Sequence, residues 1–207
     1  MKRTYWMLLL LLACGSALAQ AYQSDGKVIR VLTALQAERG EATLDAQREK
    51  RALEILRKSV ERQIVSAADV MPADKYGYVP TGGEFKGVRT FGQQVKHLAA
   101  TNYILAAAAL GEEPPMGAGD EVGPEITRTK AEILAYLNGS FAELGKAIAA
   151  IGDNNRTVKS SPISPLPGGA ATRSALVVEA LIHAFDHYGQ MVEYLRMNGV
   201  VPPASRP

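Results

Sequence analysis

ATRSALVVEALIHAFDHYGQMVEYLRMNG, residues 171–199, decides the fold class, because its apolar residues recur every three or four positions, as on one face of an α-helix. Thr172 suits the start of this helix, and Asn198-Gly199 suits its end. Two of the chain's three histidines lie four residues apart in the apolar stripe. The stripe consists of Leu176, Ala180, His183, His187, Met191 and Tyr194. Side chains four residues apart on a helix are about 6 Å apart at their Cβ atoms, so both imidazoles can reach one metal ion.

The third histidine, His97, lies in the first half of a second predicted helix. Thr90 followed by Gln93 is a capping-box pattern at the start of this helix, and Leu110-Gly111 marks its end. If the two helices pack together, all three imidazoles point into one part of the core and form a single site. The alternative is that they are hydrogen-bonded core residues. Two adjacent buried imidazoles, however, leave two donors and two acceptors that need partners, and a shared cation removes much of that need.

Two further helices are predicted, over residues 44–70 and from about Pro124 to Ile151. The apolar residues at helical spacing in the first of these are Leu53, Ile55, Leu56, Val60, Ile64 and Val65. The predicted buried face of the other consists of Ile126, Ile133, Leu137, Phe141, Leu144 and Ile148. No segment alternates with period two, so no strand is predicted. The sequence therefore predicts an all-α protein, with an antiparallel-type four-helix bundle as one domain over residues 44–203.

Three stretches of the chain carry a family resemblance: MPADKYGYVPT (71–81), FGQQVKHLAATNYILAAAALGEE (91–113) and HAFDHYGQMVEYLRMNGVVPPAS (183–205). Over about residues 45–203 the chain resembles the DinB-like (DinB/YfiT) family of metalloenzymes. The resemblance implies a four-helix bundle in which His97, His183 and His187 hold one divalent metal ion. Characterised relatives in this family include thiol-dependent S-transferases and isomerases, and metal-dependent hydrolases have been proposed.

An ion held by three neutral imidazoles keeps at least one coordination position open, as in catalytic rather than structural zinc sites. Zinc or nickel is the expected metal, since imidazole suits both. Glu179 and Asp186, one turn or less from the histidines, are candidates to orient an imidazole or to act as a general base. The alternative is that they are ordinary solvated carboxylates.

Two hypotheses about function remain open at this point. The first is a metal-dependent enzyme of the hydrolase or S-transferase type, acting on a small molecule that the sequence does not identify. The second is a non-catalytic metal-binding or stress-related helical bundle. A homodimer is compatible with either hypothesis.

The first 19 residues are typical of a secretory signal peptide. Lys2 and Arg3 precede an apolar run that is too short to span a bilayer, and small residues follow up to Ala19. The pattern predicts an exported bacterial protein, periplasmic or secreted, that starts at Gln20 and has no transmembrane helix after processing. Leu11-Leu12-Ala13-Cys14 also resembles a lipoprotein processing site, with Cys14 as the lipidated residue.

Residues 20–43 are polar and predict a loose lead-in with one short helix over Val28 to Gln36. Without the leader the chain has 21 basic and 21 acidic residues, so nothing indicates a nucleic-acid partner. Cys14 is the only cysteine. A chain that starts at Gln20 therefore has no thiol for a disulfide or for a nucleophile.

Overall fold

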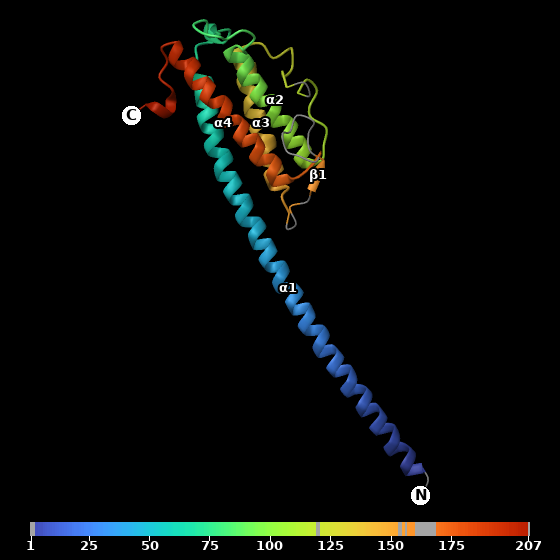
Figure 1. Ribbon diagram of the computed structural model, residues 1–207. Helices are drawn as coiled ribbons and strands as arrows, with labels where there is room; N and C mark the ends of the chain where they lie inside the picture. The colour runs from blue at the N-terminus through green and yellow to red at the C-terminus, as the bar shows by residue number, and fades with distance from the viewer. Residues whose placement is uncertain (1–2, 119–120, 153–154, 156, 160–168, 207) are drawn as a thin grey trace. The chain divides into compact units, whose positions relative to one another are not determined.

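The computed structural model describes residues 3–118, 121–152, 155, 157–159 and 169–206, with side chains at residue 30 and from residue 32 onward. It is mostly helical (Figure 1), which confirms the all-α prediction. The helices are α1 (Arg3–Val70), α2 (Phe91–Leu110), α3 (Lys130–Ala149) and α4 (Arg173–Met197). Two 3-10 turns (Ala73–Lys75 and Pro203–Ser205) and two strands, β1 (Thr157–Lys159) and β2 (Ala170–Thr172), complete the described elements. The chain divides into two units, residues 1–45 and 46–207, and the bundle belongs to the second.

Three hydrogen bonds define the helix directions in the bundle. At the start of α2, Gly92 donates to the Tyr76 carbonyl (2.8 Å), just after the end of α1. At the start of α3, the Lys130 ammonium donates to the Met71 carbonyl (3.0 Å). Near the end of α4, the Tyr194 hydroxyl donates to the Arg89 carbonyl (3.2 Å), just before α2. The bundle part of α1 and α4 therefore run one way, and α2 and α3 run the other way (Figure 1).

The shared direction of α2 and α3 differs from a simple antiparallel arrangement and depends on the connection at residues 111–129. Helix α2 has 20 residues, so it is about 30 Å long. The 19 connecting residues can span about 60 Å when extended, which is enough to return along the bundle before α3 begins.

The helix starts follow local capping patterns. Thr90 and Gln93 form the predicted capping box: the Thr90 hydroxyl accepts from the Gln93 amide at 3.2 Å, and the Gln93 side chain accepts from the Thr90 amide at 2.9 Å. Helix α2 ends at Gly111, whose φ of 78° is the left-handed conformation that glycine adopts most easily. For α3 the predicted start near Pro124 was wrong. A second capping box, formed by Thr129 and Glu132, starts the helix at Lys130.

The core consists of apolar side chains from all four helices. In α1, Leu53, Val60 and Ile64 are buried as predicted. Two other residues of the predicted pattern, Ile55 and Leu56, are 60% and 53% exposed. Ile55 lies on the side of the helix opposite Leu53, whereas Leu56 lies at the edge of the buried face. The predicted buried face of α3 is confirmed from Ile133 to Ile148. Its first member, Ile126, is 82% exposed, since the helix begins only after it.

Two features departed from the sequence predictions. Residues 20–43 are helical as part of α1, not a loose lead-in. Strands β1 and β2 were not predicted, and they pair antiparallel with Thr157 opposite Thr172. Each strand has three residues, which is too short for a period-two pattern to be recognised. None of the helices, as far as their residues are described, has a stretch both long and apolar enough to cross a membrane. The side chain of Cys14 lies outside the described part of the chain.

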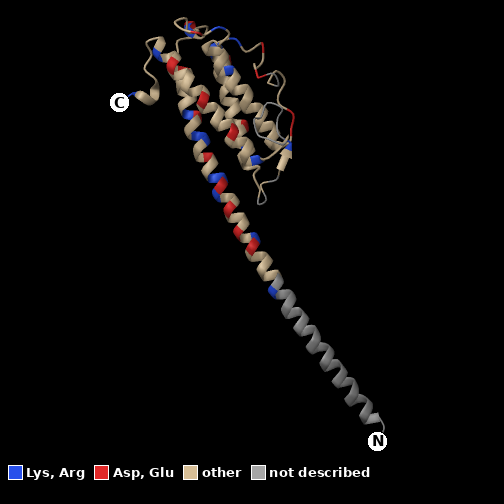
Figure 2. Cartoon of the chain, viewed as in Figure 1, with Lys and Arg blue, Asp and Glu red and all other residues tan. Residues whose placement is uncertain are grey.

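Charged side chains of both signs are interleaved along the described part of α1 (Figure 2). The run Arg48 to Arg51 is mixed, with Glu49 within it, and Arg48 and Arg51 are exposed. This arrangement agrees with a solvated helix face rather than a surface of one sign.

Candidate metal centre

The three histidines of the chain meet between α2 and α4. His97 lies on α2, and His183 and His187 lie on α4. The Nε2 atom of His183 is 3.2 Å from that of His97 and 3.0 Å from that of His187. Two nitrogens bound to one tetrahedral zinc ion at the usual 2.0–2.1 Å are about 3.3 Å apart. The prediction that these residues form a single cluster is therefore confirmed, and the nitrogen spacing fits one metal ion.

The antiparallel packing of α2 on α4 explains why these residues meet. One turn from the histidines, the Gln94 side chain on α2 donates to that of Gln190 on α4. One further turn along both helices, Tyr194 bonds to the carbonyl of Arg89, as described above. His97 and His187 each lie three residues from the glutamine on their own helix, so the helix register brings them to the same level.

The loop between α2 and α3 determines which nitrogen of His97 carries the proton. The Nδ1 atom of His97 lies 2.8 Å from the carbonyl oxygen of Glu121. Because a carbonyl only accepts, Nδ1 is the donor, and the neutral ring keeps a free electron pair on Nε2. Metal-binding histidines commonly have this arrangement, in which the second nitrogen donates to a carbonyl or carboxylate. Glu121 has a φ of 63°, an uncommon backbone conformation for a residue other than glycine.

The other two imidazoles are less well satisfied. The Nδ1 atoms of His183 and His187 are buried and have no hydrogen-bond partner in the described part of the chain. With Nε2 of His97 fixed as an acceptor, His183 has one Nε2 proton at most, and it can donate to only one of its two neighbours. A cation bound to all three Nε2 atoms satisfies each of them at once. The donor set therefore fits a divalent metal better than it fits hydrogen bonds among the histidines alone.

All three imidazoles are neutral at physiological pH. Burial, followed by the nearby charge of His97, lowers the pKa of His183 to about 4. Burial, with the neighbouring His183 and His97, lowers the pKa of His187 to about 3. The pKa of His97 is also lowered, mainly by burial. Since a metal binds only the unprotonated imidazole, these shifts leave the site ready for a metal near neutral pH.

The two predicted carboxylates have different environments. Glu179 is buried on α4, one turn before His183. Asp186 is exposed and accepts a hydrogen bond from the Gln190 side chain (3.0 Å). Its charge partly opposes the lowering of the His183 pKa, which is dominated by burial. A role for either residue in orienting an imidazole or as a general base stays a prediction.

Sequence reasoning missed Glu121, Gln94, Gln190 and Arg89, which surround the cluster. Glu121 contacts His97 across 24 residues of chain and through its backbone, so its side-chain type gives no signal. Gln94 and Gln190 each lie three residues from a histidine on the same helix face, and this spacing could have indicated them.

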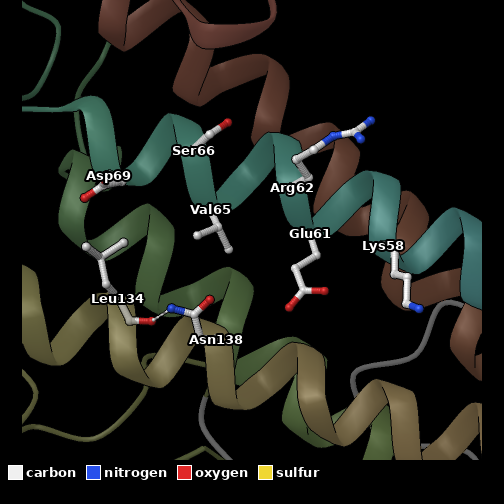
Figure 3. Close-up of a pocket in the computed structure, with 8 residues that line it drawn as sticks. All are labelled: Lys58, Glu61, Arg62, Val65, Ser66, Asp69, Leu134 and Asn138. Carbon is white, nitrogen blue, oxygen red and sulfur yellow. Dashed lines mark hydrogen bonds between the residues drawn. The ribbon is translucent and has the colours of Figure 1, made fainter.

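A separate hollow of about 520 Å³ lies between α1 and α3 (Figure 3). Its lining carries charges of both signs, from Lys58 and Arg62 and from Glu61 and Asp69. It contains none of the three histidines. The candidate metal centre is therefore a distinct site, on the α2 and α4 side of the bundle.

A helical bundle with one buried three-histidine cluster defines the class of this protein as a candidate single-metal helical protein. A family model, the DinB superfamily, matches residues 56–191, which include all three histidines. The chain belongs to the DinB superfamily. No curated protein gives a significant match to it.

Proposed function

We propose that this protein binds one divalent metal ion through the Nε2 atoms of His97, His183 and His187 and uses that ion in catalysis. The observation that carries the proposal is the approach of the His183 Nε2 atom to within 3.2 Å of that of His97 and 3.0 Å of that of His187, in a mostly apolar core. Polar nitrogens buried in such a core lower the stability of the fold unless they have a partner, and one shared cation is a partner for all three.

Catalysis is favoured over simple capture by the number of ligands and by access. Three protein ligands leave at least one position of the ion open, and a bound ion would supply a Lewis acid there. His97 and His187 are buried, but His183 is only partly buried, so the cluster lies close to the surface of the bundle on the His183 side. Zinc or nickel is the proposed metal, because the donors are all imidazole.

The reaction type we propose is metal-dependent hydrolysis, with thiol S-transfer as the alternative that the family resemblance implies. Our choice rests on the proposed location. The N-terminal pattern supports export, and the small thiols that family members use belong mainly to the cytosol. An exported protein would meet water and its substrate without such a thiol.

The metal proposal is tested with protein that has been stripped by chelation and then titrated with Zn²⁺ and Ni²⁺. We expect one ion per chain by elemental analysis. We also expect each of His97→Ala, His183→Ala and His187→Ala to lower the affinity at least about tenfold, since removing a direct ligand costs more than removing a group behind it. Glu193→Ala is the matched control, because Glu193 is exposed on α4 and lies outside the histidine stripe. Unchanged metal content in a His183→Ala, His187→Ala double variant would show that these histidines only pack in the core and do not bind the metal.

The catalytic step is tested by comparing two assays on the metal-loaded protein. One follows hydrolysis of a panel of small esters and amides, and the other follows consumption of a low-molecular-weight thiol with an electrophile. Hydrolysis that disappears on chelation supports the proposal. Thiol consumption alone selects the S-transferase, and metal binding without turnover in either assay makes the protein a metal-binding bundle.

The proposed location has its own test, the N-terminal mass of the protein recovered from a bacterial expression host. A chain that starts at Gln20, or a lipid-modified Cys14, agrees with export. An intact Met1 form in the cytosol contradicts it and removes the objection to a thiol cosubstrate.

A further inference from the structure

Binding of a metal leaves a hydrogen-bond donor on the second nitrogen of each histidine ring. A neutral imidazole that binds an ion through Nε2 carries its proton on Nδ1. The Glu121 carbonyl accepts from Nδ1 of His97 (2.8 Å), but Nδ1 of His183 is buried and has no partner among the described residues. A buried donor without an acceptor lowers stability, so the metal-bound form of His183 needs an acceptor close by.

Thr101 on α2 has a buried hydroxyl that lacks a partner. Its side chain is 4% exposed, and its oxygen has no hydrogen bond to any residue that the structure describes. A threonine within a helix can donate to the carbonyl four residues before it, here that of His97, but Thr101 does not. Buried polar groups are rarely left without a partner, so this hydroxyl needs an explanation.

The helical spacing of α2 directs Thr101 toward α4. Thr101 follows His97 by four residues and Gln94 by seven, so the three side chains lie on one face of the helix. The other two both contact α4, since His97 lies against the α4 histidines and Gln94 donates to an α4 glutamine. Beyond Thr101, the Ala109 carbonyl accepts from the Arg173 side chain of α4 (2.7 Å). Thr101 is therefore buried between α2 and α4, with contacts to α4 on both sides of it.

The antiparallel packing of the two helices brings Thr101 to the level of His183. His97 lies opposite His187, and a step of four residues along each helix, in opposite chain directions, leads to Thr101 and His183. The Arg173 contact gives the same level to within two residues. An unpaired buried hydroxyl and an unpaired buried imidazole nitrogen thus lie at one level of the same interface.

We propose that the Thr101 hydroxyl accepts a hydrogen bond from Nδ1 of His183, directly or through one bridging water, when His183 binds the metal through Nε2. The two atoms are not hydrogen-bonded in the structure, so the contact requires a small rotation of the side chains or the water. The inference rests on the proposed function, because it requires bound metal. Thr101 is then a positioning residue that fixes the tautomer and orientation of His183 and does not touch the ion.

The first test compares the Zn²⁺ affinities of variants of the full protein, by competition with a coloured chelator. Thr101→Val replaces the hydroxyl by a methyl group, and Thr101→Ser keeps the hydroxyl. We expect Thr101→Val to bind Zn²⁺ about tenfold more weakly, and Thr101→Ser to stay within about threefold of the wild type. Ser140→Ala is the matched control, because Ser140 has a buried hydroxyl that bonds to Asn102, on α3. It should keep the wild-type affinity.

Two results of this comparison overturn the inference. An unchanged affinity in Thr101→Val means that the hydroxyl has no part in metal binding. Equal losses in Thr101→Val and Ser140→Ala mean that any buried hydroxyl of the bundle affects the site through packing.

A double-mutant cycle identifies the histidine that Thr101 positions. Thr101→Val is combined with His183→Ala and, separately, with His187→Ala. Because only residues that interact are non-additive, we expect the effect of Thr101→Val to disappear when His183 is removed and to persist when His187 is removed. An effect that persists in His183→Ala overturns the assignment to His183.

NMR of the wild-type protein, loaded with Zn²⁺ and labelled with ¹⁵N at histidine, tests the contact even if Thr101→Val does not fold. We expect the proton of His183 on Nδ1, with a cross-peak to the Thr101 side chain. A proton on Nε2, or an Nδ1 proton without this cross-peak, overturns the inference. A wild-type protein that binds no Zn²⁺ refutes the proposed function itself, and this outcome is distinct from the others.

Discussion

At the scale of single residues, the carbonyl of Glu121 determines the protonation form of His97. It fixes the proton of His97 on Nδ1, so the ring's free electron pair is directed to the other two histidines. Without this contact the neutral ring could carry its proton on either nitrogen, and only one of the two forms binds a metal through Nε2. One backbone group in a loop thus determines which nitrogen of a helical histidine is free to bind a metal ion.

The histidine pKa values predict how the metal-free protein responds to acid. The folded-state pKa of His183 is about 4 and that of His187 about 3, compared with 6.5 for an ordinary histidine. Between these values the unfolded chain binds more protons than the folded protein, so stability must fall as the pH drops below 6.5. We expect the melting temperature of the chelated protein to decrease from pH 7 to pH 5, a range above most carboxylate titrations.

The measurement is a set of thermal melts followed by circular dichroism between pH 7 and pH 5. The comparison variant is His183→Gln, His187→Gln, which cannot take up these protons. Its melting temperature should depend less on pH over this range. An equal pH dependence of the two proteins would show that the histidines are not the groups that titrate.

The sequence could identify the three clustered histidines but not their surroundings, for a physical reason. His97, His183 and His187 lie on helix faces, and a helix face is determined by local spacing. Glu121 and Arg89 lie in connections, where position depends on contacts with distant residues such as Tyr194. Such contacts leave no periodic pattern in the chain.

At the scale of elements, the pairing of α2 with α4 forms the site, and three levels of contact set its register. The levels are the bond from Tyr194 to Arg89, the bond from Gln94 to Gln190, and the histidines themselves. A shift of either helix by one residue would turn its side chains by about 100° and separate the cluster. The alanines of α2 that are fully buried, among them Ala99, Ala100 and Ala106, allow the close packing that this register needs.

The start of α3 gives a prediction at this scale. The Thr129 hydroxyl accepts from the Glu132 amide at 3.3 Å, and the Glu132 carboxylate accepts from the Thr129 amide at 2.8 Å. Thr129→Ala removes the first of these bonds, so we expect it to destabilise the protein by about 1 kcal/mol. Urea unfolding measures this difference. Thr81→Ala, in an exposed loop position, is the control and should change stability by less than about 0.5 kcal/mol.

The same capping box explains why the predicted start of α3 was wrong. Pro124 and the apolar Ile126 fit a helical pattern by spacing alone. The Thr129 and Glu132 side chains satisfy the first free amides of the helix only if it begins at Lys130. The capping pattern was present in the sequence, and it was a better guide than the apolar spacing. An unchanged stability of Thr129→Ala would mean that packing, and not capping, decides where α3 begins.

At the scale of the whole molecule, the bundle of residues 46–207 holds the histidines at its α2 and α4 side and does not build its core around them. The largest fully buried side chains, such as Phe91, Phe141 and Leu137, are apolar and come from α2 and α3 as well as α4. Small proteins that need a metal to fold lack such a core, and their metal-binding energy is their folding energy. A bundle of this size has enough buried apolar surface to fold by itself.

We therefore expect the chelated protein to keep its helical circular dichroism and a cooperative melt at neutral pH. Metal binding should raise the free energy of unfolding by about 3 kcal/mol when the free metal concentration is a hundred times its dissociation constant. The melting temperature should rise by the corresponding amount and no more. The measurement is a pair of melts, with and without a chelator, on the wild type and on His97→Ala. Because His97→Ala lowers the affinity at least about tenfold, its two melts should differ by about half as much as those of the wild type, or less. If the wild-type protein unfolds at room temperature on chelation, the ion is a structural metal ion. The proposed catalytic role would then lose its physical basis, because a structural ion is commonly coordinated fully by protein groups.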